Sequence, residues 1–381
     1  MKEKTITIGI PCYKASKTID RLLASILMQT FAKDRLQVIL ANDCPEDNHT
    51  YDYLHDRFPE LNIVVLGCKK NSGPGIARQR CLDACTTDYI LFCDADDTLH
   101  DPFVLENLIS QFKQDTVVEV FAPFMQVTDN THPQTGVRIN VPQRNPLHPW
   151  VFGRMYSVKF LKDNDIRFPD KLRAMEDACF NWQLNMLTNG TQFKITCIND
   201  IIAYDWMPGS EHSITRIGTV NNIPQYNFDL CRVGAILAAE YAINFVKTKN
   251  PFNANIMKFA TEQFVNCYFM SIECEGKRKE FLEQCLYLSK YFYNKVFKCY
   301  ETLVPDKALD QMYTQMMVQR AGDLVGVIPF ITFHDWLTQV RESTFDVSEI
   351  VSIRKNFPKE IIDNDIASGV IDASCNLFIG E

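Results

Sequence analysis

The chain has 381 residues, of which 46% are hydrophobic and 23% charged. This length suits two domains, whose core is large enough to need no disulfide support. The formal net charge of -8 argues against sequence-independent binding to a nucleic-acid backbone, which requires a basic face.

The cysteines and the N-terminus indicate the compartment. The 14 cysteines form no CxxC framework with zinc-ligand spacing, and most lie singly in apolar runs. This pattern predicts reduced, buried thiols and therefore a reducing compartment. Residues 1–4 lead directly into a strand, so we expect no signal peptide, and no apolar stretch is long enough for a membrane span. We expect a cytoplasmic protein, with peripheral contact at the inner face of the membrane left open.

Strand and helix patterns alternate over the first 125 residues. A predicted helix with Ser16 as its N-cap follows the first strand, and Gly73-Pro74-Gly75 begins a second helix. Short β-branched or apolar runs predict buried strands at residues 5–10, 38–40, 63–66 and 89–93. The alternation predicts an α/β fold with a mostly parallel sheet, helices on both faces, and ligands at the carboxyl ends of the strands.

The rest of the chain divides into two parts. Residues 126–224 hold a proline-rich stretch and then a predicted helix over residues 177–187. From residue 225 to 381, apolar residues recur at helical spacing, as at Phe281, Cys285, Leu288 and Phe292. We therefore predict a domain over residues 1–224 and a helical C-terminal domain over residues 225–381.

The strongest cluster of functional residues is Asp94-Ala95-Asp96-Asp97, directly after a buried strand. Crowded carboxylates repel one another unless a cation neutralises them. Oxygen ligands at a strand end suit Mg²⁺ or Mn²⁺, which in turn bind a diphosphate. The alternative is an acidic loop that caps the next helix.

Four weaker clusters have both a functional and a structural interpretation. Asp43 can bind a ribose or base edge, or form an Asx turn before Pro45. The glycines of residues 71–78 permit close backbone approach and Arg78 can contact a phosphate, unless the segment is a plain loop-to-helix junction.

The other two clusters follow later in the chain. Glu176-Asp177 can supply a base that removes an acceptor proton, or simply a favourable acidic start to a helix. Residues 212–216, which include His212 and Arg216, can close over a bound donor, or form an ordinary polar loop.

The order and spacing of these clusters resemble glycosyltransferase family 2, whose catalytic domain has the GT-A fold. The resemblance covers roughly residues 4 to 220, and the ordered set is far more specific than any one motif. The matching segments are 10–13, 42–43, 71–73 with Arg78, 94–97, 150–156, 166–169 and 176–177. The chain has Asn42 where the family commonly has an acid.

The resemblance implies a role for each matching residue. Its donor half is about residues 1–125 and its acceptor half about 126–224. Asp177 matches the catalytic base, with Glu176 supporting the acceptor. The metal ligands would be Asp96, Asp94 and His212. The donor contacts would come from Pro11, Tyr13, Asp43, Asn71, Gly73, Arg78, Asp94, Asp97 and Arg216.

These roles imply an inverting glycosyltransferase. A divalent metal, Mn²⁺ or Mg²⁺, would offset charge on the departing diphosphate while Asp177 deprotonates the acceptor hydroxyl in a single displacement. A retaining transferase and a nucleotidyltransferase fit the motifs less well, since Glu176-Asp177 is present and no Gly-rich, Lys-containing signature follows the first strand. A non-catalytic nucleotide-sugar or glycan-binding protein with a degenerate GT-A domain is the main alternative.

The sequence defines substrates only by class. We expect a nucleotide-sugar donor, with UDP favoured, carrying a hexose or N-acetylhexosamine. The acceptor would be a glycan, a lipid-linked oligosaccharide or a polymer such as a surface polysaccharide. For the C-terminal helices, acceptor binding, membrane contact and formation of a homo-oligomer all remain open.

Overall fold

The computed structural model describes residues 3–127, 134, 141–143, 149–170, 172, 174–207, 232–251, 253–275, 280–322, 324, 329 and 331–343. The chain divides into two compact units, Met1–Asn222 and Ile223–Glu381. This division falls close to the boundary predicted at residue 224. The split of the first unit into donor and acceptor halves stays a prediction.

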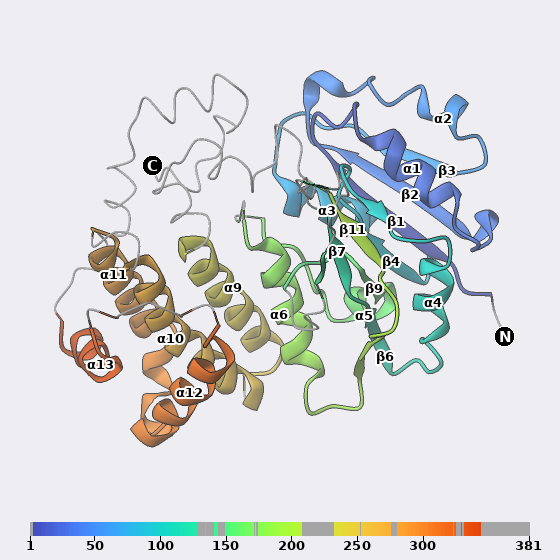
Figure 1. Ribbon diagram of the computed structural model, residues 1–381. Helices are drawn as coiled ribbons and strands as arrows, with labels where there is room; N and C mark the ends of the chain where they lie inside the picture. Colours follow the sequence, from blue (N-terminus) through green and yellow to red (C-terminus); the bar gives the residue numbers. More distant parts are fainter. Residues whose placement is uncertain are drawn as a thin grey trace. The chain divides into compact units, whose positions relative to one another are not determined.

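The first unit is built on a seven-stranded sheet with the order β10-β6-β9-β4-β1-β2-β3 (Figure 1). Every neighbouring pair is parallel except those made by β9, which runs antiparallel to β4 and β6. The strands are β1 (Ile6–Cys12), β2 (Leu36–Asn42), β3 (Asn62–Leu66), β4 (Tyr89–Phe92), β6 (Val117–Phe121), β9 (Arg154–Ser157) and β10 (Lys194–Cys197). The predicted α/β fold with a mostly parallel sheet is confirmed.

A smaller sheet with the order β5-β11-β7-β8 lies in the same unit. In it, β11 is parallel to β7 and antiparallel to β5. Its strands are β5 (Thr98–Leu99), β7 (Phe124–Gln126), β8 (Val141–Gln143) and β11 (Tyr204–Trp206). This second sheet brings the residues after β4 next to a strand that lies about a hundred residues later.

Helices cover both faces of the main sheet (Figure 1). The even-numbered residues of β1, such as Ile8, join a core that includes buried residues of α1 and α4. Gly9 faces α3, because a Cβ atom at Gly9 would lie 2.9 Å from the Cβ of Cys81 on that helix. The helices of this unit are α1 (Ile19–Leu27), α2 (Leu54–Arg57), α3 (Pro74–Ala84), α4 (Val104–Ser110), α5 (Val158–Asp163) and α6 (Glu176–Thr188).

Two local predictions need correction. Ser16 is not the N-cap of α1: the helix begins at Ile19 with Thr18 as its N-cap, after a turn that Ala15 closes by accepting from Thr18 N–H. The first strand also continues through Pro11 instead of ending before it. The backbone of Gly9 hydrogen-bonds to β4, and the backbone of Pro11 points to the same side. The β1–β4 pairing ends at Gly9, so the missing N–H of Pro11 interrupts no hydrogen bond between the strands.

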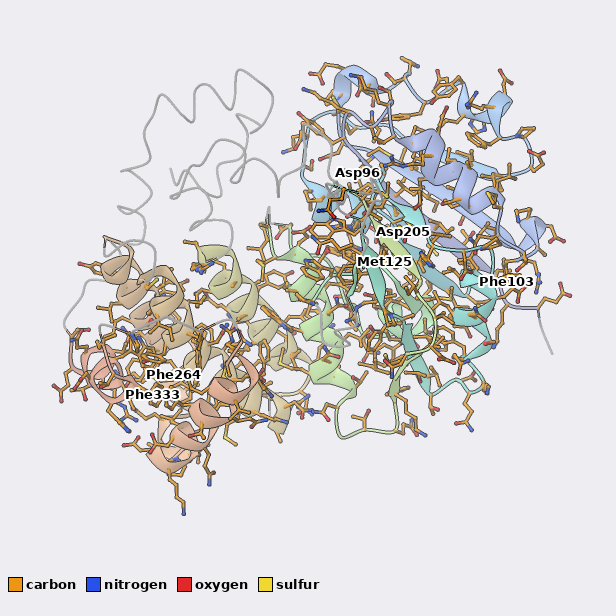
Figure 2. The ribbon with its side chains drawn as sticks, in the orientation of Figure 1. Asp96, Phe103, Met125, Asp205, Phe264 and Phe333 are labelled. Atoms are coloured by element: carbon orange, nitrogen blue, oxygen red, sulfur yellow. The ribbon has the colours of Figure 1, made fainter. Side chains whose placement is uncertain are left out.

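The second unit is helical in its described residues, as predicted. Its core is aromatic: the ring centroid of Trp336 lies 5.1 Å from that of Phe264 and 5.7 Å from that of Phe333, and Figure 2 labels the last two. The helices are α9 (Gly234–Lys249), α10 (Ala254–Glu275), α11 (Glu280–Lys295), α12 (Asp306–Gln319) and α13 (Phe333–Glu342). Among the described residues, no helix is both long and apolar enough to cross a membrane.

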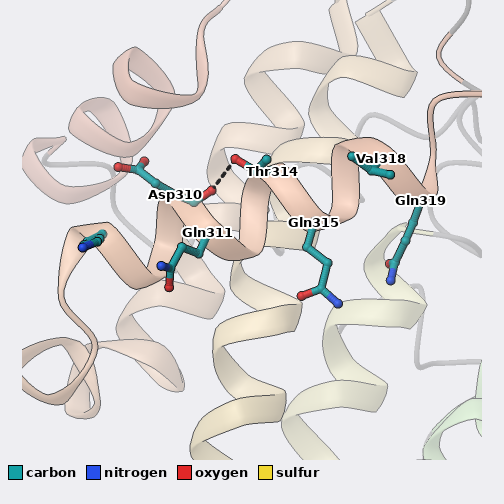
Figure 3. A pocket seen from close by; sticks show the side chains of 7 residues that line it. Asp310, Gln311, Thr314, Gln315, Val318 and Gln319 are labelled. Atoms are coloured by element: carbon teal, nitrogen blue, oxygen red, sulfur yellow. Dashed lines mark hydrogen bonds between the residues drawn. The ribbon is translucent and has the colours of Figure 1, made fainter.

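One face of α12 carries a shallow depression of about 620 Å³ (Figure 3). It is lined largely by glutamines and by Val318, which is 74% exposed. None of the residues expected in the site line it. In the described residues every cysteine is free, and most are buried, which agrees with the prediction of unpaired thiols.

Candidate active site

The acidic segment follows β4 at the carboxyl edge of the main sheet, where Figure 2 labels Asp96. Asp97 is buried, and its carboxylate accepts hydrogen bonds from the hydroxyl of Tyr204 at 2.7 Å and from the N–H of Met207 at 2.8 Å. Burial raises the pKa of Asp97 well above its ordinary value, and the neighbouring Asp94 and Asp96 raise it further. The Tyr204 hydroxyl also accepts from Asp94 N–H at 2.8 Å, so one phenol fixes both ends of this turn.

Arg78 connects the acidic segment to the predicted base. Its side chain, on α3, is 5% exposed. Nη2 donates to Asp94 at 2.6 Å, and Nη1 donates to Glu176 at 2.7 Å and to Asp177 at 2.8 Å. Burial disfavours the charge on Arg78, but the three carboxylates outweigh it and hold the pKa of Arg78 well above its usual value. We call these four residues the Arg78 cluster.

The cluster holds one positive charge against three negative ones, which shapes the chemistry of Asp177. Burial is the main cause that raises the pKa of Asp177 to about 7; Arg78 opposes this rise and Glu176 adds to it. The second oxygen of Asp177 accepts from Val151 N–H at 3.4 Å. A carboxyl group that titrates near neutral pH is suited to accept a proton from a hydroxyl.

Local backbone geometry allows α3 and α6 to meet at this cluster. Met175, the residue before α6, adopts a left-handed conformation with φ of 63°. A Cβ atom at Gly75 would lie 3.2 Å from both Cβ and Cγ of Glu176. The small residue at position 75 therefore lets the two helices approach closely enough for Arg78 to bond with both acids of α6.

One residue predicted to contact the nucleoside is held in place by the loop before α3. Asp43, buried at the end of β2, accepts from the N–H groups of Ser72 at 2.8 Å and Gly73 at 2.7 Å. Gly73 has φ of 89°, a conformation that favours glycine. The side chain of Asn42 bonds to Cys44 and to Asn48, so this departure from the family pattern serves the turn itself.

Of the remaining predicted residues, three lie in the part of the chain that the structure describes and two lie outside it. Pro11 and Tyr13 lie partly exposed at the end of β1, and Asn71 lies partly exposed before α3. His212 and Arg216 lie outside the described residues. Whether Arg78 contacts a donor phosphate stays a prediction, since both of its terminal nitrogens bond to carboxylates.

The fit to a divalent cation rests on the chemistry of two side chains. Asp94 and Asp96 offer carboxylate oxygens of the kind that Mg²⁺ and Mn²⁺ bind. Within the described part of the chain, no group of three or more His, Cys, Asp or Glu residues is arranged to hold a metal ion. The two acids therefore fit a cation that takes its other ligands from a bound diphosphate or from elsewhere in the chain.

Sequence reasoning missed Tyr204, Asn181 and the contact surface at Trp150. Asn181, one turn after Asp177, donates to the carbonyl oxygens of Pro149 at 2.7 Å and Trp150 at 3.2 Å. These contacts bridge segments about thirty to a hundred residues apart, and no local pattern marks them. The one available signal was that Tyr204-Asp205-Trp206 reads as a short strand with aromatic residues on both sides of an acid.

Comparison with known proteins identifies the class. The sequence model described as Glycosyl transferase family 2 matches residues 7–169. Processive diacylglycerol beta-glycosyltransferase of Mycoplasma pneumoniae is 35% identical over 325 residues, which cover 77% of this chain and 92% of that protein. Poly(ribitol-phosphate) beta-N-acetylglucosaminyltransferase TarS of Staphylococcus aureus is 27% identical over 206 residues, covering 52% of this chain and 35% of TarS. The chain thus spans only about a third of the length of TarS.

Solved structures agree on the fold. The structure described as S. aureus TarS 1-349 in complex with UDP matches with a TM-score of 0.54 at 20% identity, over 84% of this chain and 92% of that one. The main sheet and the acidic segment at its carboxyl edge define a glycosyltransferase with the GT-A fold. The chain belongs to glycosyltransferase family 2.

Proposed function

We propose that this protein is an inverting glycosyltransferase that moves a hexosyl or N-acetylhexosaminyl group from a UDP-sugar to a hydroxyl of a glycan or glycopolymer acceptor. The observation that carries this proposal is the Arg78 cluster, in which a carboxyl group with a pKa of about 7 is held beside the first acid of the segment after β4. A single displacement requires a base held close to the bound donor, and the shared guanidinium supports such an arrangement.

Asp177 acts as the base in this proposal. Its carboxylate accepts the proton of the acceptor hydroxyl as that oxygen attacks the anomeric carbon, and the bond to the diphosphate oxygen breaks on the opposite face. Arg78 and Val151 N–H fix the orientation of the carboxylate, and the Asp177 side chain is only 13% exposed, which limits its contact with water. Glu176 accepts a hydrogen bond from Arg78 and supports the acceptor.

The donor binds along the carboxyl edge of the sheet. Pro11, Tyr13 and Asp43 contact the nucleoside, with Asp43 also fixing the loop at Ser72 and Gly73. Asp97, held by Tyr204 and Met207, positions the donor sugar. Asn71, Arg78 and Arg216 complete the donor contacts.

A divalent cation, Mn²⁺ or Mg²⁺, belongs to this mechanism as a donor-side cofactor. Asp96, Asp94 and His212 would hold it, and when bound it offsets the negative charge of the departing diphosphate. The two acids supply the hard oxygen ligands that such an ion prefers.

The names of the relatives support a class of acceptor. One relative is named for poly(ribitol-phosphate) and another for diacylglycerol, so a polymer or lipid-linked hydroxyl is the acceptor class we propose. The sugar in the name of TarS, N-acetylglucosamine, matches one of the two proposed donor types. We place the reaction in the cytoplasm, extending to the inner face of the membrane.

Donor hydrolysis in the absence of acceptor tests the enzyme class. Purified protein is incubated with Mn²⁺ and each of UDP-glucose, UDP-galactose, UDP-N-acetylglucosamine, GDP-mannose and dTDP-glucose, and released nucleotide is measured. We expect release from one UDP-sugar, lost with EDTA and in Asp96→Asn. The exposed Asp52→Asn is the matched control and should retain full release.

A different outcome would favour the alternative function. If no donor is hydrolysed but one of them raises the melting temperature, the protein is a nucleotide-sugar-binding protein and not an enzyme. If neither hydrolysis nor a thermal shift occurs with any donor, the transferase proposal is wrong.

A further inference from the structure

Trp150 presents an exposed aromatic surface beside the predicted base. The indole is 41% exposed, although the rings around it are mostly buried. It stacks on Phe152 with a centroid distance of 5.6 Å and on Trp206 with a distance of 6.3 Å, and Phe124 meets it edge-on at 5.6 Å. Such packing holds the ring in place, because moving it would break several aromatic contacts.

The backbone of Trp150 is fixed to the same helix turn as Asp177. Asn181 donates to the Trp150 carbonyl oxygen, and the next N–H, of Val151, donates to Asp177. The hydroxyl of Tyr156 donates to Asn181 at 2.8 Å and so orients its amide. The aromatic ring and the base therefore hold a constant separation.

The other end of the aromatic stack reaches the donor side. Trp206 precedes Met207, whose N–H binds Asp97, and Tyr204 on the same strand binds Asp97 through its hydroxyl. The stack thus extends from the acid proposed to position the donor sugar to the base proposed to activate the acceptor. A molecule whose hydroxyl reaches Asp177 approaches the segment that carries Trp150, because Val151 N–H bonds to that carboxylate.

We propose that Trp150 forms an acceptor subsite that binds the apolar C–H face of a pyranose ring carrying or adjoining the attacking hydroxyl. This rests on the proposed glycosyltransferase function. Pyranose rings have one face of C–H groups that packs on an aromatic ring, while their hydroxyls stay available for polar partners. The subsite favours a glycosylated acceptor over an acceptor without a sugar ring.

The first test measures binding and needs no turnover. Methyl β-D-glucopyranoside, methyl β-D-galactopyranoside and methyl N-acetyl-β-D-glucosaminide are titrated into the protein with UDP and Mn²⁺ present, and tryptophan fluorescence is followed. The chain has only four tryptophans, so a change at one is readily seen. We expect at least one glycoside to alter the emission of the wild type but not of Trp150→Phe. No change with any glycoside overturns the proposal, whether or not donors are hydrolysed.

The second test separates the acceptor from the donor. With the donor found by hydrolysis, transfer to the responsive glycoside is measured in Trp150→Phe, which keeps a ring, and in Trp150→Leu, which does not. We expect the acceptor KM to rise about tenfold in Trp150→Leu and less in Trp150→Phe, with a smaller effect on kcat. Phe103→Leu, at another exposed aromatic residue, is the control.

Three outcomes of the second test contradict the proposal. An unchanged acceptor KM in Trp150→Leu would show that Trp150 forms no acceptor subsite. A rise in the donor KM, measured by hydrolysis, with no rise in the acceptor KM would assign the ring to the donor sugar. An equal loss in both ring and ringless variants would show that the indole only supports the fold. Failure of donor hydrolysis in the wild type is separate and counts against the proposed function itself.

Discussion

Arg78 and Asp177 are joined by a 2.8 Å hydrogen bond although 99 positions separate them in the chain. The same guanidinium binds Asp94, so the base and the first acid of the donor segment share one cation. The position of the proposed base relative to the proposed donor segment is therefore set by α3, a helix that carries none of the three acids.

Replacing Arg78 should disrupt both activity and stability. Arg78→Lys keeps the charge but cannot bind three carboxylates from two nitrogens, so we expect donor hydrolysis to fall at least about a hundredfold. Arg78→Ala leaves buried acids without their cation, which costs on the order of 3–5 kcal/mol of unfolding free energy. Chemical denaturation and hydrolysis rates measure the two effects. Arg57→Lys, at an exposed ion pair, should change neither.

The pH profile of transfer should reflect Asp177. Because burial raises its pKa to about 7, the reactive carboxylate form predominates only above that pH. We expect kcat/KM to rise about tenfold per pH unit below 7 and then to level off. The profile is measured from pH 5 to 9 with the donor found by hydrolysis. A rate that is flat between pH 5 and 7 would exclude Asp177 as the titrating base.

Asp177→Asn should inactivate the protein and yet stabilise it above neutral pH. The folded-state pKa of Asp177 lies above its ordinary value of 3.8, so its contribution to stability is fully present below about pH 4 and is lost as pH rises through about 7. Asparagine does not titrate and removes one of three crowded anions. The melting temperature of the variant, relative to the wild type, should therefore be higher at pH 8 than at pH 5. A difference that does not grow with pH would contradict this account.

Tyr204→Phe should weaken donor binding without changing the titration of the proposed base, Asp177. The change removes a hydroxyl that donates to the buried Asp97 and accepts from Asp94 N–H. An unsatisfied buried group costs about 1–3 kcal/mol, so we expect lower stability and a higher donor KM. The pH dependence of kcat/KM should keep the wild-type form, because the bonds of Asp177 to Arg78 and Val151 are unchanged. An unaltered donor KM would mean that Asp97 does not position the donor.

Gly75→Ala should separate α3 from α6. The added methyl group would lie 3.2 Å from Glu176, closer than ordinary packing allows. We expect a loss of about 1–3 kcal/mol in unfolding free energy and a lower hydrolysis rate, since Arg78 and Asp177 move apart. Gly322→Ala is the matched control, because nothing lies within 4 Å of its added atom. Equal effects from the two changes would show that helix contact does not limit activity.

Local patterns predicted the strands and the acids that follow them. The run ending at Cys93 marked a buried strand, and three carboxylates directly after it had to lie at the sheet edge. The same reasoning could not place the N-cap of α1, because Ser16 and Thr18 offer similar side chains and the turn at Ala15 decided between them.

Contacts between distant segments were beyond sequence reasoning. Arg78 was predicted to contact a phosphate because a cation after glycines suits that role, but nothing local shows that three acids surround it. Tyr204 and Trp150 gain their positions from pairing in the smaller sheet and from Asn181, which requires the folded chain. His212 and Arg216 lie outside the described residues and stay predictions.

The Arg78 cluster also joins segments of the chain that are made at different times during synthesis. When only the first 125 residues have emerged from the ribosome, β1, β2, β3 and β4 can pair, but Arg78 has Asp94 as its single partner in the cluster. Arg78 can bond to its other two carboxylate partners only after residues 176 and 177 have been made and α6 has packed against α3. A nascent chain can therefore form four neighbouring strands of its sheet before the predicted base can meet Arg78.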